Sequence, residues 1–315
     1  MTPIDKFLNS ENLYLTDGGF ETWLFFVDGF EAPEFAAITL MEDEKARLAM
    51  WRYFERFLEI AEYAGRGFVL DTNSWRGCVS WADKLELSRQ DLLALSGEAV
   101  AFAKDIRAAW QGRVEPILIN AVVGPSGDGY KPGDTPTAEE AYKLHMPQLE
   151  VFAAHQVDMV SALTITNIGE AVGIVRAAKE RELPVVISFT VETDGRLTTG
   201  ETLAEAIALV DEYTDSGPLY YMVNCAHPEH FRGALQTDAG WVNRIGGIRA
   251  NASRLSHAEL DDAETLDDGN PEEFGSLYKE LSELLPNLKV VGGCCGTDHR
   301  HVGCASRRLT SSKAA

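Results

Sequence analysis

Eight short apolar runs, each ending in glycine or polar residues, alternate along the chain with longer segments whose apolar residues follow helical spacing. The runs that predict strands are 13–16, 68–70, 116–123, 159–163, 184–189, 219–223, 245–248 and 288–291. The segments that predict helices are 44–63, 91–110, 138–154, 169–180, 203–213, 228–235 and 272–285. Strands that alternate with helices form parallel sheets, and eight such units favour a (β/α)8 TIM barrel. We expect one domain over residues 1–315, with its core at roughly 13–301.

A doubly wound open sheet is the competing α/β fold. It commonly carries a glycine-rich phosphate turn, G-x-G-x-x-G, after its first strand. The first predicted strand here ends in Asp17-Gly18-Gly19-Phe20, which does not match that turn. In a barrel, the carboxyl ends of all strands open onto one face, and that face carries the chemistry. We therefore expect the polar residues at the strand ends to form one site.

Charge excludes several classes of partner. The chain carries 49 acidic and 28 basic residues, a net charge of −21. Such a surface repels nucleic-acid phosphates and anionic lipids, so neither nucleic acid nor a membrane is an expected partner, whereas a cationic small molecule is compatible. The chain starts without the apolar segment of a secretion signal, and no run reaches the ~18 apolar residues of a membrane span. These features predict a cytoplasmic protein, and a homo-oligomer stays open.

The strongest chemical signal is Gly292-Gly293-Cys294-Cys295-Gly296, at the end of the eighth predicted strand. Neighbours on a strand point to opposite faces, but a bend flanked by glycines lets both sulfurs turn toward one point. Cys225 ends the sixth predicted strand, on the same face, and can supply a third sulfur. Three protein ligands with one open position are typical of catalytic zinc, and thiolates favour zinc over magnesium or calcium. The sequence predicts Zn²⁺ on Cys225, Cys294 and Cys295.

A thiolate-rich zinc site favours sulfur chemistry over hydrolysis. Three thiolates already donate much charge, so the metal is a weak Lewis acid for activating water. Contact with a metal lowers the pKa of a thiol from about 8.5, and the resulting thiolate is a nucleophile toward carbon. Alternatives stay open at this point. His227, or the pair His299 and His301, is a candidate for a further ligand. Four protein ligands would make the zinc structural and the barrel non-catalytic.

These elements resemble the zinc-dependent homocysteine S-methyltransferase family, which includes betaine–homocysteine and S-methylmethionine–homocysteine methyltransferases. The matching pieces, in family order, are Asp17-Gly18-Gly19-Phe20-Glu21-Thr22, Asp71-Thr72-Asn73, Gly124-Pro125, Asn224-Cys225 and residues 292–298. The resemblance implies zinc on the three cysteines, with homocysteine thiolate at the open position accepting a methyl group from an onium donor to form methionine. It also implies that Asp17 and the backbone N–H groups near Gly18 and Gly19 hold the amino-acid head group. The remaining expected substrate contacts are Asn73, Thr164 and Asn224.

Two departures from the family pattern bear on the acceptor. Leu163 stands where the family usually has a glutamate that contacts the substrate amino group, and the segment 249–253 lacks the common Pro-Asn pair. Replacing a carboxylate by an apolar side chain removes a partner for an ammonium. Asp17, Glu21 and Asp71 are the candidates to compensate. Methyl transfer to a different thiol is the alternative reading.

Aromatic residues near the strand ends bear on the donor. Trp23 and Trp75 follow the first two predicted strands, and Trp81 and Tyr130 lie in the loops beyond. An aromatic face attracts a quaternary ammonium or a sulfonium by about 0.5–2 kcal/mol. We expect Trp23, Trp75 and Tyr130 to contact a cationic donor; the alternative is that these rings only pack.

Overall fold

A computed structural model describes residues 1–130, 133, 135–237, 239–263 and 265–310. Within these residues, eight parallel strands close into one barrel in chain order, and β8 pairs with β1. The strands are β1 Tyr14–Leu15, β2 Phe68–Asp71, β3 Ile117–Val123, β4 Met159–Ile165, β5 Val185–Phe189, β6 Tyr221–Asn224, β7 Ile245–Ala250 and β8 Val290–Gly293. The predicted TIM barrel is therefore confirmed.

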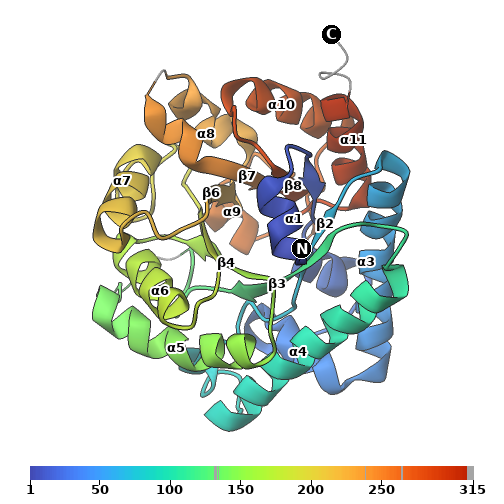
Figure 1. Cartoon of the computed structure of the whole chain (residues 1–315), viewed down its shortest axis with the longest axis vertical. Helices are drawn as coiled ribbons and strands as arrows, with labels where there is room; N and C mark the ends of the chain where they lie inside the picture. Colours follow the sequence, from blue (N-terminus) through green and yellow to red (C-terminus); the bar gives the residue numbers. More distant parts are fainter. Residues whose placement is uncertain (131–132, 134, 238, 264, 311–315) are drawn as a thin grey trace.

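Helices surround the barrel in the order of the chain, as the colours of Figure 1 show. The main ones are α3 Glu44–Ala64, α4 Arg89–Trp110, α5 Ala138–Ala154, α6 Ile168–Glu180, α7 Leu203–Thr214, α8 Pro228–Leu235, α10 Pro271–Leu284 and α11 His299–Thr310. Local chemistry sets where they start. In α5 and α7, for example, Thr137 and Thr202 form capping boxes with the glutamates three residues later. None of the helices in the described part of the chain is long and apolar enough to cross a membrane.

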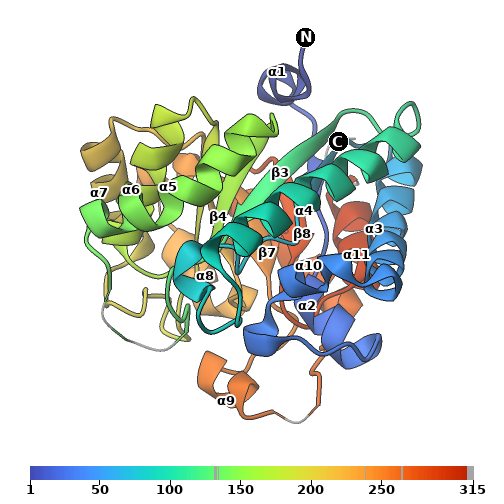
Figure 2. The same ribbon diagram turned by 90° about the horizontal axis from the view of Figure 1, so that it is seen from below.

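The two ends of the barrel differ. Helix α1 (Pro3–Asn9) lies at one end, and the short helices α2 (Phe20–Thr22) and α9 (His257–Asp261) lie at the other (Figure 2). Phe7 of α1 packs edge-on against Tyr14, with ring centroids 4.9 Å apart, and both side chains are buried. Val69, Leu118 and other inward side chains of the strands continue this core. Apolar packing thus fills the amino end, and polar residues collect at the carboxyl end.

Several element boundaries differ from the prediction. Strand β4 continues to Ile165 and β7 to Ala250, while β8 starts two residues later than predicted, at Val290. Helix α11 was not predicted, because its segment is rich in arginine and histidine and shows only a narrow apolar stripe. Two predicted helices, 138–154 and 228–235, match α5 and α8 in full.

Candidate metal and substrate site

The three predicted zinc ligands converge. The sulfur atoms of Cys225, Cys294 and Cys295 all lie within 4.8 Å of one another. Cys225 follows β6, and the other two follow β8, so the barrel brings together residues about 70 positions apart in the chain. Cys225 and Cys294 form a disulfide in this structure, with their Cα atoms 5.3 Å apart, and Cys295 is a free thiol. The disulfide must be reduced before all three sulfurs can bind a metal as thiolates.

This donor set fits zinc. Burial, with nearby Glu21 acting in the same direction, raises the pKa of Cys295 to about 11. A bare thiolate is therefore unfavourable at this position, and a divalent cation would reverse that balance. Zinc prefers four ligands, so three cysteine sulfurs would hold it and leave one position for a substrate. The residues present thus suit a catalytic rather than a closed metal centre.

The backbone beside Cys225 is strained. Cys225 has φ +52° and Thr164 has φ +64°, a left-handed conformation that a β-branched residue rarely adopts. Asn224 stabilises it: its Oδ1 accepts from the Thr164 backbone N–H, and its Nδ2 donates to the Thr164 hydroxyl, both at 2.9 Å. The Thr164 hydroxyl donates to the Cys225 sulfur at 3.7 Å. Thr164 and Asn224 therefore lie in the site, where they orient a cysteine.

The histidines considered as further ligands have other roles. His227 accepts the Glu229 backbone N–H at the start of α8, and burial lowers its pKa to about 4. One ring nitrogen of His301 is hydrogen-bonded to the Asp298 carboxylate, and the other is hydrogen-bonded to the Asp268 carbonyl. His299 packs beside the Trp23 ring. Within the described residues, the metal-ligating cluster contains the three cysteines alone.

Gly18 and Gly19 have a structural role. The Gly18 N–H donates to the Tyr53 hydroxyl at 3.1 Å, and the Gly19 N–H donates to the Thr297 carbonyl at 2.9 Å. Both N–H groups have partners within the protein in this structure, and the expectation that they hold the substrate head group stays a prediction. A Cβ at Gly19 would lie 2.5 Å from the Cys294 carbonyl oxygen. Glycine here lets the loop after β1 pack directly on the cysteine loop.

A Gly19→Ala variant is therefore expected to displace the Cys294 loop. The added methyl meets backbone atoms, so relief requires a main-chain shift that costs about 1–3 kcal/mol. We expect a lower melting temperature and weaker zinc retention under a competing chelator. Gly233→Ala is the matched control, since a Cβ there has no atom of another residue within 4 Å. A Gly19→Ala protein that retains zinc like the control would contradict this role.

An ion-pair network that was not predicted lies beside the cysteines. Arg249 of β7 donates through Nη2 to Asp17 and through Nη1 to Asp71, and its Nε donates to the Gly293 carbonyl at 3.1 Å. All three charged side chains are buried. Burial raises the pKa of Asp17 to about 6, and Arg249 acts in the opposite direction. Asp17, expected to bind substrate, is thus paired within the protein.

A cavity of about 570 Å³ opens above this network at the carboxyl end of the barrel. Its wall includes every residue predicted for metal or substrate, together with Trp75 and Tyr130: Asp17, Gly18, Gly19, Asn73, Thr164, Asn224, Cys225, Cys294 and Cys295. Among the charged residues of the wall, carboxylates outnumber guanidinium groups: Asp17, Glu21, Glu34, Asp71, Asp128, Asp261 and Asp267 against Arg76 and Arg249. The cavity therefore favours cationic ligands.

The predicted donor-binding rings separate into two groups. Trp75 and Tyr130 line the cavity, and the Tyr130 ring lies 4.6 Å from the ring of His257, which also lines it. Trp23 lies outside the cavity wall, because the π-helical turn Trp23–Val27 (η1) places its ring under the Arg56 guanidinium, 4.6 Å away. The structure thus brings two of the three rings to the site and not Trp23. Trp81 is buried under Arg76.

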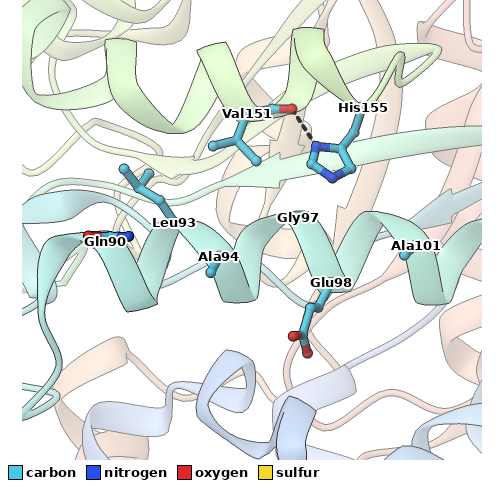
Figure 3. A pocket seen from close by; sticks show the side chains of 8 residues that line it. All are labelled: Gln90, Leu93, Ala94, Gly97, Glu98, Ala101, Val151 and His155. Atoms are coloured by element: carbon cyan, nitrogen blue, oxygen red, sulfur yellow. Dashed lines mark hydrogen bonds between the residues drawn. The ribbon is translucent and has the colours of Figure 1, made fainter.

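A second hollow, of about 480 Å³, lies on the outer surface between α4 and α5 (Figure 3). Its wall consists of Gln90, Leu93, Ala94, Gly97, Glu98, Ala101, Val151 and His155. His155 Nδ1 is bonded to the Val151 carbonyl at 2.9 Å. This hollow shares no lining residue with the cavity at the cysteines, and it contains none of the residues predicted for metal or substrate.

Comparisons with known proteins identify the family of this chain. A family model described as homocysteine S-methyltransferase matches residues 14–309. The structure is similar to the homocysteine methyltransferase MmuM from Escherichia coli in its metallated form, with a TM-score of 0.76 and 19% identity over 98% of this chain and all of that one. The comparison with the oxidised form of the same protein gives a TM-score of 0.75 and 20% identity, again over 98% of this chain and all of that one. The comparison with curated proteins gives no match. At such identities the structural likeness shows the fold, whereas the family model spans nearly the whole chain, and the protein therefore belongs to the homocysteine S-methyltransferase family and is a methyltransferase.

Proposed function

We propose that the protein is a zinc-dependent S-methyltransferase that moves a methyl group from an onium donor to the thiolate of homocysteine, forming methionine. The donor is a betaine, S-methylmethionine or another sulfonium. The observation that carries this proposal is the convergence of three cysteine sulfurs within 4.8 Å at the wall of a deep cavity. Family membership supplies the reaction class, and the donor set supplies the reason for zinc.

Methyl transfer needs the thiolate of the acceptor to lie beside the methyl group of the bound donor. Cys225, Cys294 and Cys295, once reduced, would hold zinc, and the bound zinc would supply the positive charge that stabilises a substrate thiolate at neutral pH. The acceptor sulfur then attacks the methyl carbon in line. The new S–C bond forms as the N–C or S–C bond of the donor breaks, and the electron pair of that bond leaves with the donor, which loses its positive charge. The thiol proton goes to solvent.

The protein's own residues support both partners. The Thr164 hydroxyl donates to the Cys225 sulfur, and the same bond would stabilise a Cys225 thiolate that binds zinc. The carboxylates of the wall attract a cation into the cavity, and Tyr130 and Trp75 offer faces that contribute about 0.5–2 kcal/mol each toward an onium group. Transfer between two bound partners needs orientation more than acid–base help, so a rigid cavity suits it.

A donor screen tests the proposal. The purified zinc-loaded protein is incubated with homocysteine and, separately, with glycine betaine, S-methylmethionine and S-adenosylmethionine, and methionine is measured. We expect turnover with at least one of these cations. Removal of zinc by a chelator is expected to abolish it, and added zinc to restore it. If none of the cations yields methionine, the proposed reaction is wrong.

Leu163 supports a second candidate, transfer to a thiol other than homocysteine. Leu163 is 9% exposed, lines the cavity and packs among the inward apolar side chains of the barrel. It offers no partner to a substrate ammonium. Competition between homocysteine and thiols that lack the amino group separates the two candidates, since the better substrate has the higher kcat/KM.

We also propose a cytoplasmic location, without nucleic-acid or membrane partners, and a homo-oligomer stays open. The net charge of −21 supports the choice of partners. A reducing compartment keeps three clustered cysteines available as thiolates for metal. Size-exclusion chromatography with light scattering determines the oligomeric state.

A further inference from the structure

An amino-acid acceptor carries an ammonium group, and among side chains a carboxylate both accepts its hydrogen bonds and compensates its charge. The two carboxylates of the network already have internal partners. On Asp17, Oδ1 accepts from Arg249 and the Thr16 hydroxyl, and Oδ2 accepts from the Tyr53 hydroxyl at 3.2 Å. On Asp71, Oδ2 accepts from Arg249, and Oδ1 accepts from Asn120 Nδ2 at 2.6 Å. An ammonium at either residue would have to compete with a buried guanidinium.

Glu21 differs from both. It lies in α2, directly after the loop of β1, is half-buried, and lines the same cavity. Among the described residues, its carboxylate forms no ion pair and no hydrogen bond to another side chain. The Glu21 carboxylate contributes to raising the pKa of Cys295 and of Tyr130, and both of these residues line the same cavity. Burial, with Asp17 acting in the same direction, raises the pKa of Glu21 to about 7, while Arg249 and Arg76 act in the opposite direction without forming an ion pair with it.

Two further acceptors in the wall lack donors. Asn73 is 5% exposed and Asn251 is 3% exposed, and the Oδ1 atom of each is buried without a hydrogen-bond partner in the described part of the chain. Their Nδ2 atoms are engaged, in Asn73 with the Met41 sulfur and in Asn251 with the Cys225 carbonyl. Buried acceptors of this kind are uncommon unless a ligand supplies the donor. Both residues line the cavity, but their two Oδ1 atoms are covered by protein, so neither oxygen is assigned as a ligand contact.

We propose that Glu21 binds the ammonium group of the acceptor amino acid, in place of the glutamate that Leu163 replaces and of Asp17, which is held by Arg249. This inference rests on the proposed function, since it assumes an amino-acid thiol as acceptor. It makes Glu21 a specificity-determining residue. Asp17, Asp71 and Arg249 then form a fixed framework beside the substrate.

The test compares two thiols in two proteins. Homocysteine and 4-mercaptobutyrate differ only in the amino group. In the wild type, we expect kcat/KM to favour homocysteine by about 10–100-fold, the range for a hydrogen bond to a charged group. In Glu21→Gln, kcat/KM for homocysteine is expected to fall by about the same factor, mainly through KM, while that for 4-mercaptobutyrate changes less than about threefold. Calorimetric titration of the zinc-loaded proteins with homocysteine is expected to show the same weakening in Kd.

Glu31→Gln is the matched control. Glu31 is exposed, lies ten positions further along the chain and is outside the cavity wall, so the same change of charge there is expected to leave both thiols unaffected. Equal losses with both thiols in Glu21→Gln, or loss of its zinc, would assign Glu21 to the fold or the metal site and overturn the inference. Unchanged kinetics in Glu21→Gln would overturn it as well. If the wild type methylates neither thiol with any onium donor, the proposed function itself fails, and that outcome is seen without any variant.

Discussion

Replacing Cys294 by serine is expected to remove the bound metal and to lower methyl transfer by at least about 10³-fold. A serine hydroxyl stays protonated at neutral pH and is a poor zinc ligand, so two sulfurs would remain of the three that lie within 4.8 Å of one another. The substrate thiol would then lose the cation that keeps it ionised. Zinc per chain, measured by mass spectrometry, is expected to fall from about one to near zero, as is expected for a site that needs all three thiolates.

Cys304→Ser is the control for this experiment. Cys304 lies in α11, away from the cluster, and its thiol donates to Glu272 at 3.2 Å, a bond that a serine hydroxyl can also form. This variant is expected to retain its zinc and its activity. Cys225→Ser and Cys295→Ser are expected to behave like Cys294→Ser. A Cys294→Ser protein with full zinc and full activity would show that the three sulfurs do not form the metal site.

The features that the sequence predicts well are those with a local signal. Alternating strand and helix patterns predicted the barrel, and strand ends in a barrel share one face, so Cys225 and the pair at 294–295 were expected to meet. The structure brings their sulfurs together. The sequence also predicts a role in the site for Gly18 and Gly19, but it does not reveal whether their N–H groups are free. In the structure, both N–H groups form hydrogen bonds within the protein.

The features that the sequence does not predict depend on distant pairs. Arg249 is 232 positions from Asp17 and 178 from Asp71, and no spacing rule connects residues of β7 with those of β1 and β2. Trp23 follows a strand end, as a donor-binding ring should, yet a π-helical turn places it against Arg56 outside the cavity. Glu21 appeared in the sequence as one of three carboxylates, and the structure distinguishes it because the other two are paired.

Arg249→Met is expected to destabilise the protein by about 3–5 kcal/mol, because it leaves two buried carboxylates without their counter-ion. The side chain of Arg249 is 6% exposed, and those of Asp17 and Asp71 are 2% and 7% exposed, so water cannot replace the lost partner. For a chain of this size, the melting temperature is expected to fall by roughly 5–8 °C. Thermal unfolding followed by circular dichroism measures the change.

Two further variants separate the effect of leaving buried carboxylates unpaired from the effect of removing an arginine side chain. Arg254→Met removes an ion pair to Glu273 whose side chains are about half exposed, and such pairs contribute at most about 1 kcal/mol, so little change in melting temperature is expected. The triple variant Asp17→Asn, Asp71→Asn, Arg249→Met removes all three charges and is expected to recover part of the lost stability, since no carboxylate remains unpaired. If the triple variant is less stable than Arg249→Met, the carboxylates contribute more through their bonds to Tyr53 and Asn120 than through Arg249. In that case Asp17 would not depend on Arg249, and the reason for excluding it as the ammonium partner would be lost.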